Sequence, residues 1–307
     1  MAIRRDHHPD GRDTIVQIGR VEFDGKAEPA IHHNHAWVRL TDSDTPDIEV
    51  LDVLDRHAEF ATRLANLDID AEIAAGRAVA DSEARLVLPL NHRRSIVAVG
   101  LNYAAHADEV SFTSVDHPLL FAKWPGALTG PFDDVVLNET LSAQVDYEVE
   151  LAAVIGRTAQ DVAPEDALEY VAGYMVSNDI SARDIQQSES QWTRAKSFNG
   201  FCPIGPWITS SDEIPDPQNL TISSYVNGER RQHASTSQML HPVAEIIAFA
   251  TRGATLFPGD IIITGTPAGV ALGDSSLKWL QPGDVLRCEI EGLGHLENTM
   301  VLGGNAR

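Results

Sequence analysis

The stretch that most constrains this chain is VDYEVELAAVIG, residues 145–156, an apolar run that carries Glu148 and Glu150 two positions apart. In a β-strand, residues i and i+2 point to the same face, so we expect both carboxylates to face one small volume. Because the flanking residues are apolar, these charges would be poorly hydrated and would repel each other without a positive partner. The pattern indicates a divalent cation, and its alternative is the solvated face of an edge strand.

The composition argues against several classes of partner. The 307-residue chain has 45 Asp and Glu residues against 23 Lys and Arg, a net charge of -22, and such a field repels nucleic acid and anionic membranes. The two cysteines, Cys202 and Cys288, are too few for a disulfide framework. The sequence contains neither an apolar leader nor an apolar run of about 18 residues. We therefore expect a cytoplasmic protein without nucleic-acid or membrane partners.

The chain is expected to divide into a small N-terminal accessory domain, residues 1–90, and a larger domain, residues 91–307. In the first part, alternating residues predict short strands around a turn at Asp24-Gly25, and residues 53–67 have the apolar spacing of a helix. This part carries no other chemical signal than scattered histidines.

The histidines His32, His33 and His35, with His7 and His8 before them, could bind a metal ion. The segment that carries them is polar and irregular, and it lacks the ordered spacing that a metal site needs. Surface histidines are the favoured interpretation.

In the larger domain, residues 95–100 read as a strand, and the next segment places His106 and Glu109 three residues apart. On a helix this spacing puts both on one face, where a carboxylate raises the basicity of an imidazole and fixes its tautomer. A general base is one interpretation, and a chance pair is the other. Lys123, at the end of an apolar run, is either a substrate contact or a surface lysine.

Further on, a helix is predicted to begin near Pro164, and a strand over residues 174–180 would deliver Asp179 to the site. An Asn227-Gly228 turn predicts a hairpin, and residues 243–251 read as a helix before a buried strand at 261–264. Strands outnumber helices, so the predicted class is α+β and β-rich.

Seven motifs that follow one another along this part of the chain resemble the fumarylacetoacetate hydrolase (FAH) superfamily. They cover about residues 94–302 and read GLNYAAHADE, VDYEVELAAVIG, NDISARDIQ, AKSFNGFCPIGP, NGERRQ, LFPGDIIITGTPAGV and EIEGLGHLEN. The resemblance implies an FAH-type mixed β-sandwich roll with a small N-terminal accessory domain. It also makes residues 91–307 the FAH-like catalytic domain.

The resemblance also implies roles for individual residues. A divalent ion, Mg²⁺ or Mn²⁺, with Ca²⁺ as a substitute in a crystal, would be held by carboxylates that match Glu148, Glu150 and Asp179. His106 and Glu109 match the family's catalytic pair on a lid helix, and Lys196 matches its active-site lysine. The positions that match substrate contacts are Lys123, Arg183, Gln186 and Thr266.

The function expected from this resemblance is a metal-dependent hydrolase that cleaves a C–C bond in an acylpyruvate-like or 2,4-diketo (sugar) acid. In that reaction His106 with Glu109 would deprotonate a water molecule, and Lys196 would stabilise the developing negative charge. The same metal-enolate chemistry leaves a 2-hydroxydienoate isomerase or hydratase and an oxaloacetate decarboxylase as alternatives. A non-catalytic metal-binding module is a further one. We expect a homodimer that binds a small anionic 2-oxo or diketo acid.

Overall fold

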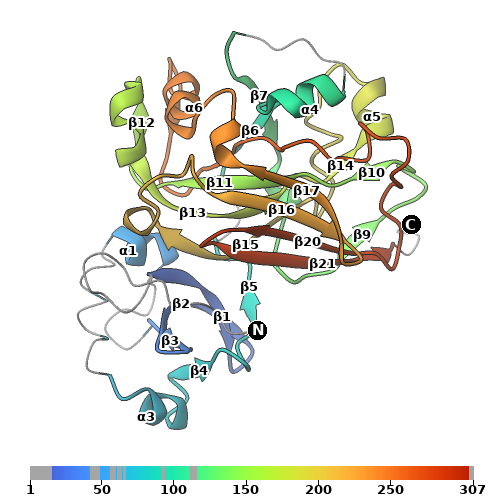
Figure 1. Ribbon diagram of the computed structural model, residues 1–307. Coiled ribbons are helices and arrows are strands. Elements are labelled where there is room, and N and C mark those ends of the chain that lie inside the picture. The colour runs from blue at the N-terminus through green and yellow to red at the C-terminus, as the bar shows by residue number, and fades with distance from the viewer. Residues whose placement is uncertain are drawn as a thin grey trace.

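The computed structural model describes residues 16–41, 49–55, 60, 64, 67–90, 94–110 and 116–303. Within these ranges strands predominate and the helices are short (Figure 1). The α+β, β-rich class expected from the sequence is confirmed. None of the described helices is long and apolar enough to span a bilayer.

The largest sheet is built around β11 (Val149–Ile155), which pairs antiparallel with β13 (Val171–Asn178) and with β19 (Ile261–Ile263). Every residue of β11 is buried, as its apolar run predicts. The strand order is β4-β3-β2-β1-β15-β13-β11-β19-β6-β7, with β5 on β1 and β8 on β15. The other strands are β1 (Gln17–Phe23), β2 (Lys26–His33), β3 (Ala36–Arg39), β4 (Ala78–Ala80), β5 (Leu86–Val87), β6 (Ile96–Gly100), β7 (Leu119–Lys123), β8 (Leu128–Thr129) and β15 (Cys202–Ser210).

A second sheet, with strand order β17-β16-β20-β21-β9, packs against β11 and β13. Alternate residues of β11 divide between two cores: Val149 and Leu151 share one with Leu286, whereas Ala152 shares the other with Ile263. β11 therefore lies between two apolar layers. Its packing against both of them fixes the position of its N-terminal end, which carries Glu150. The strands of this sheet are β9 (Val135–Leu137), β16 (Thr221–Val226), β17 (Glu229–Ser235), β20 (Val285–Ile290) and β21 (Gly294–Leu302).

Short elements complete the described part of the chain. The predicted helix at 243–251 is α6 (Val243–Ala250), whereas the helix predicted near Pro164 is a 3₁₀ helix, η2 (Pro164–Tyr170). A 3₁₀ helix rises further per residue, so it spans the short link to β13. The remaining elements are β10 (Val145–Asp146), β12 (Ala159–Gln160), β14 (Ser181–Ala182), β18 (Thr255–Leu256), α1 (Val50–Asp55), α3 (Ile69–Ala74), α4 (Ala104–Glu109), α5 (Arg183–Ser188), η1 (Pro125–Ala127), η3 (Ser211–Glu213) and η4 (Thr236–Gln238).

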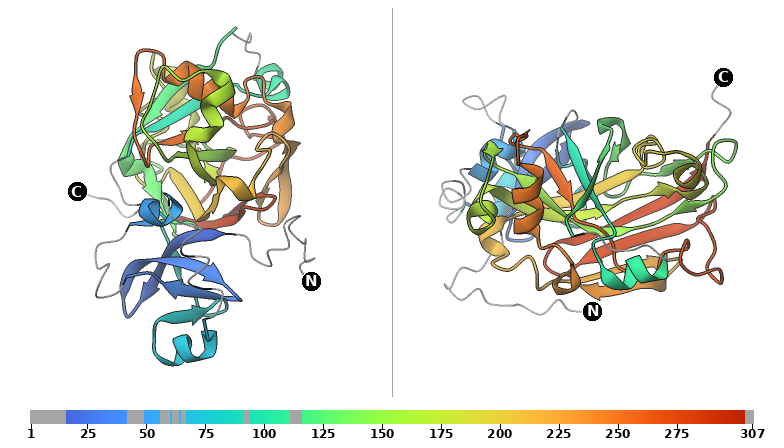
Figure 2. Two further views of the ribbon diagram at one scale, coloured as in Figure 1. Left: turned by 90° about the vertical axis from the view of Figure 1, so that its left-hand side faces the viewer. Right: turned by 90° about the horizontal axis from the view of Figure 1, so that it is seen from above.

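The N-terminal strands extend the large sheet and lie at one end of the molecule (Figures 1 and 2). The predicted turn is present between β1 and β2, where Asp24 and Gly25 both have positive φ, 50° and 76°. β1 joins the rest of the sheet by pairing with β15. The helix predicted over residues 53–67 lies mostly outside the described residues, and the domain boundary at residue 90 stays a prediction.

Candidate metal centre and active site

Glu148, Glu150 and Asp179 meet where β11 begins and β13 ends. The antiparallel register pairs Val149 with Asn178, and the Asp179 N–H donates to the Glu148 carbonyl oxygen at 2.9 Å. One carboxylate oxygen from each of the three acids lies within 4.8 Å of the others, and all three side chains are buried. The sequence-predicted acidic residues are therefore brought together into one cluster.

The strand geometry differs in one respect from the expectation. Glu148 lies in the link between β10 and β11, so Glu148 and Glu150 are not two alternate residues of one strand. The reason is that these backbone N–H groups bond to side chains and not to the backbone carbonyls of a neighbouring strand. The Glu148 N–H donates to Asn178 Oδ1 at 3.0 Å, and the Val149 N–H donates to Gln232 Oε1 at 3.1 Å. The carboxylates of Glu148, in the link, and of Glu150, in β11, still lie close to each other and to Asp179.

Three buried cations surround this cluster. Lys196 Nζ donates to Glu148 at 2.7 Å and to Asp179 at 2.8 Å. Arg183 donates to Glu148 at 2.6 Å and to Asp146 at 2.9 Å, and Lys123 donates to Asp179. Four buried carboxylates thus face three buried cations, so one negative charge would be uncompensated if all four carboxylates were ionised.

The uncompensated carboxylate belongs to Glu150. Among the described side chains it has no ion-pair partner, and it accepts a hydrogen bond from the Gly265 N–H at 2.8 Å. Burial, with Asp179 and Glu148 close by, raises the pKa of Glu150 well above its ordinary value. Burial would also raise the pKa of Glu148, but Lys196 and Arg183 outweigh it and lower that pKa to about 2. The cluster thus lacks a balancing positive charge for Glu150 and offers three oxygen donors, which are the ligands that a hard divalent cation prefers.

The predicted His106–Glu109 pair is formed on α4. His106 Nδ1 lies 3.2 Å from Glu109 Oε2, and Glu109 also accepts the Gly269 N–H at 3.0 Å. Gly273 packs so closely against Glu109 that a Cβ on it would lie 1.9 Å from Glu109 Cγ. With Nδ1 directed at the carboxylate, the other ring nitrogen of His106, Nε2, is the one available for proton transfer.

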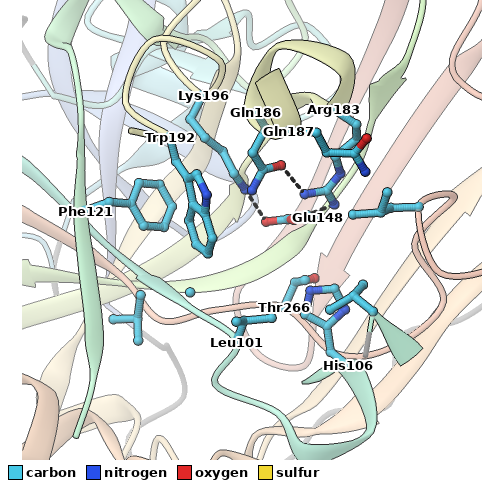
Figure 3. Close-up of a pocket in the computed structure, with 14 residues that line it drawn as sticks. Leu101, His106, Phe121, Glu148, Arg183, Gln186, Gln187, Trp192, Lys196 and Thr266 are labelled. Carbon is cyan, nitrogen blue, oxygen red and sulfur yellow. Dashed lines mark hydrogen bonds and ion pairs between the residues drawn. The ribbon is translucent and has the colours of Figure 1, made fainter. Parts of the chain in front are cut away.

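A cavity of about 220 Å³ separates His106 from Glu148 and Lys196 (Figure 3). Its polar side also holds Arg183 and Gln186, whose Oε1 accepts from the Arg183 guanidinium at 2.9 Å. The cavity is lined by Val99, Gly100, Leu101, His106, Val110, Phe121, Glu148, Arg183, Gln186, Gln187, Trp192, Lys196, Thr266 and Leu272.

Two of the predicted substrate contacts have other partners in this structure. Lys123 is fully buried and is not among the residues that line the cavity; its ammonium also donates to the Phe201 carbonyl at 3.0 Å. Thr266 does line the cavity, but its hydroxyl donates to the Val149 carbonyl at 2.9 Å and accepts from Gln232 at 2.8 Å. Lys123 therefore supports the carboxylate cluster through Asp179, and Thr266 holds the first residue of β11.

Sequence reasoning missed two residues that shape the site. Asp146 precedes Glu148 by two positions, the same spacing that singled out Glu150, and it fixes Arg183 while accepting the N–H groups of Ala271 and Leu272. Trp192, four residues before Lys196, forms a wall of the cavity. The spacing could have identified Asp146, whereas nothing in the sequence around Trp192 indicates which way its ring points.

The N-terminal histidines do not form a metal cluster among the described residues. His32 Nε2 instead lies 3.0 Å from Asp81, which fits the surface interpretation. His7 and His8 lie outside the described residues.

Sequence comparison finds relatives that share this part of the chain. A model of the family described as fumarylacetoacetate (FAA) hydrolase, C-terminal, matches residues 95–301. The mitochondrial oxaloacetate tautomerase Fahd2a of Rattus norvegicus is 40% identical over 221 residues, which are 72% of this chain and 70% of the rat protein. Residues 95–301, which match the family model, contain the carboxylate cluster, the cations and the His106–Glu109 pair.

Solved structures extend the similarity over nearly the whole chain. A fumarylacetoacetate hydrolase from the psychrophile Exiguobacterium antarcticum is 37% identical, with a TM-score of 0.78 over 94% of this chain and 100% of that one. A maleylpyruvate hydrolase from Sphingobium sp. SYK-6, solved with manganese(II) and pyruvate, is 28% identical with a TM-score of 0.74 over the same shares. Both proteins share the fold described above.

Proposed function

Because this chain belongs to the fumarylacetoacetate hydrolase family, we propose that it is a metal-dependent enzyme that interconverts the keto and enol forms of a small 2-oxo acid. The observation that carries this proposal is the position of His106, paired with Glu109, across the cavity from Glu148 and Lys196. Tautomerisation needs a base that moves the C3 proton and positive charge that stabilises the enolate. Both requirements are met by residues that face the same cavity.

The metal would be held by Glu148, Glu150 and Asp179, whose oxygen donors suit Mg²⁺ or Mn²⁺. When bound, the ion supplies positive charge beside the 2-oxo group of the substrate. It would also balance the charge of Glu150, which none of the described cations does.

Proton transfer falls to His106. Nε2 takes the proton from C3 of the keto form, the enolate oxygen takes a proton from solvent water to give the enol, and His106 then releases its proton to solvent. In the reverse direction the enol oxygen loses its proton to solvent and Nε2 returns a proton to C3. Glu109 holds the ring through Nδ1 and stabilises the imidazolium while the proton is on it. Glu109 is itself fixed by the Gly269 N–H, so the ring is oriented before substrate arrives.

Lys196 provides a fixed positive charge on the opposite side. Burial alone would lower its pKa, but Asp179 and Glu148 raise the pKa above its ordinary value, so the ammonium stays charged. It can donate to an oxygen on which negative charge develops. The substrate is therefore proposed to be anionic, with its 2-oxo carboxylate end toward Lys196 and the metal.

Hydrolysis of a C–C bond in an acylpyruvate-like or 2,4-diketo acid is the second candidate. It is favoured by the similarity to a maleylpyruvate hydrolase solved with manganese(II) and pyruvate. In this reaction His106 would take a proton from water instead of from C3. Isomerisation or hydration of a 2-hydroxydienoate and decarboxylation of oxaloacetate would also proceed through an enolate and would use the same residues.

The test starts from EDTA-treated protein and the enol form of oxaloacetate, whose ultraviolet absorbance is followed with and without Mg²⁺ or Mn²⁺. Pyruvate formation from oxaloacetate and from a small 2,4-diketo acid is measured in parallel. Metal-dependent loss of the enol without pyruvate supports tautomerisation. Pyruvate from the diketo acid would move the assignment to hydrolase, and pyruvate from oxaloacetate alone to decarboxylase.

Glu109→Gln is the matched variant for this assay. The amide keeps an oxygen for the Gly269 N–H but removes the charge that stabilises the imidazolium, so turnover should fall by about 10²- to 10⁴-fold. Metal affinity and the unfolding temperature should stay close to those of the wild type. If turnover is undetectable in wild type as well while Mn²⁺ still binds, a non-catalytic metal-binding module is the better description.

A further inference from the structure

The cavity is chemically divided (Figure 3). Glu148, Arg183 and Lys196 lie on one side, whereas Phe121 and Trp192 lie together on another. Val99, Gly100 and Leu101 continue the apolar side along the end of β6. A ligand that reaches from the carboxylate cluster to Trp192 therefore passes from charged to apolar surroundings.

The Trp192 ring packs closely against two neighbours, Phe121 and Gly100. Its edge-to-face contact with Phe121 has a centroid distance of 5.5 Å and an interplanar angle of 74°. On another side it packs against Gly100, where an added Cβ would lie 2.6 Å from Trp192 Cζ3. The backbone of Gly100 is not in the left-handed region, so what the glycine provides is room for the ring.

The cations near the cavity are already engaged with carboxylates. Arg183 donates to Asp146, Glu148 and Gln186, and Lys196 donates to Glu148 and Asp179. Lys196 Nζ lies 5.4 Å from the centroid of the Phe121 ring and marks the border of the apolar side. A second carboxylate buried beside Trp192 would find no free cation there among the described side chains, whereas an alkyl or aryl group would gain by leaving water.

We propose that Phe121 and Trp192 form a subsite for an uncharged tail of the substrate, and that Trp192, seated against Gly100, sets the length of tail that fits. This inference rests on the proposed function for the position of the 2-oxo carboxylate end. It favours 2-oxo acids whose tail beyond C3 is alkyl or aryl, so oxaloacetate, whose group beyond C3 is a carboxylate, serves in the assay above as a short probe and should be turned over less efficiently than an alkyl-tailed 2-oxo acid. Trp192 and Gly100 are specificity-determining residues in this scheme, and they take no part in proton transfer.

The experiment measures binding of inert analogues to the Mn²⁺-loaded protein by calorimetry. Oxamate and its N-methyl, N-ethyl, N-propyl and N-butyl derivatives keep the 2-oxo carboxylate end but have no C3 proton. N-carboxymethyl oxamate supplies a charged tail of similar length. In wild type we expect affinity to rise about fourfold for each methylene up to a limiting length. The charged tail should bind at least about tenfold more weakly than the N-propyl one.

Two variants should move the limiting length in opposite directions. Trp192→Ala should extend it, so that N-butyl oxamate gains about tenfold relative to oxamate. Gly100→Ala should push the ring into the subsite and weaken N-propyl oxamate by about tenfold while oxamate itself is little changed. Trp192→Phe keeps a ring, so its limiting tail length should lie between those of Trp192→Ala and wild type. The control is Trp124→Ala, since that side chain is 52% exposed and does not line the cavity.

Binding and turnover separate the two proposals. Equal affinity for all tail lengths, or the same profile in Trp192→Ala, Gly100→Ala and wild type, would overturn the subsite whether or not the enzyme is active. Tighter binding of the charged tail would overturn it as well. If the profiles shift as expected but 2-oxo acids show no metal-dependent proton exchange at C3 in D₂O, the subsite stands and the proposed tautomerisation fails.

Discussion

Glu150 is the one carboxylate of the cluster that has no ion-pair partner among the described side chains. Its pKa in the folded, metal-free protein is raised by burial and by Asp179 and Glu148. The folded state therefore holds a proton that the unfolded state loses above the ordinary Glu pKa. Stability of the metal-free protein should fall as the pH rises from about 4.5 toward the raised folded-state pKa, because the unfolded state binds fewer protons there.

Substitution of Glu150 by Gln should remove this pH dependence. An amide cannot ionise, so the metal-free variant should be at least as stable as wild type near pH 7. The increase in unfolding temperature that Mn²⁺ gives to wild type should be lost. Scanning calorimetry between pH 5 and 8, with and without Mn²⁺, tests both parts. A variant that is about 3 kcal/mol less stable without metal would contradict the uncompensated charge, since that is the cost of breaking a buried ion pair.

The spacing of Glu148 and Glu150 is a local signal, whereas Asp179 was assigned to the cluster through the resemblance, and the partners of the cations are not local. Lys123 is the last residue of β7, and only the pairing of β7 with β6, Lys123 opposite Ile96, turns its side chain inward. The preceding residues of β7 are half-buried or exposed, so no alternation of buried and exposed residues along the strand indicates that Lys123 is buried. The sequence around Lys123 left a substrate contact and a surface lysine open, and the resemblance favoured the substrate contact.

At the level of elements, the loop after β19 fixes the position of α4 through contacts with Glu109. Gly269 donates to Glu109, and Gly273 lies against the same side chain. These contacts join residues about 160 positions apart, so the sequence could predict the helix face shared by His106 and Glu109 but not what holds it. The β11 strand was predictable from its apolar run, whereas the alternative of a solvated edge strand is excluded only by the burial of every β11 residue.

Gly273→Ala should separate the base from the metal centre. The new methyl group would occupy the place of Glu109 Cγ, so α4 or the Glu109 side chain must move and the contact with His106 is lost. We expect turnover to fall by about 10²-fold or more while Mn²⁺ affinity is unchanged, because the carboxylate cluster is on other elements. Gly126→Ala is the control, because Gly126, like Gly273, has no positive φ and an added Cβ there would meet only an ordinary contact, Asn199 Oδ1 at 3.6 Å. Equal losses in both variants would argue against a specific effect on Glu109.

At the scale of the whole molecule, residues up to position 90 share one apolar core with the rest of the chain. Val53 and Leu90 belong to the same apolar cluster as Ile208 and Ile261, and β1 covers the edge of β15. Deleting residues 1–90 would expose this cluster and an unpaired strand edge. We expect the fragment 91–307 to aggregate or to lose its cooperative unfolding transition. A soluble fragment with the unfolding temperature of the full chain would instead support an independent accessory domain.

The net charge of -22 acts on the whole molecule as well. Like charges repel over the compact surface, and salt screens this repulsion over about 10 Å at 0.1 M and about 3 Å at 1 M. The unfolding temperature should therefore rise by several degrees between about 0.02 and 0.2 M KCl and change less above that range. NaCl should act like KCl, because screening depends on ionic strength, and sucrose at equal osmolality serves as the uncharged control. A curve that is flat at low salt and rises only above about 1 M would mean that exclusion of salt from the surface, and not charge repulsion, governs the stability of this acidic protein.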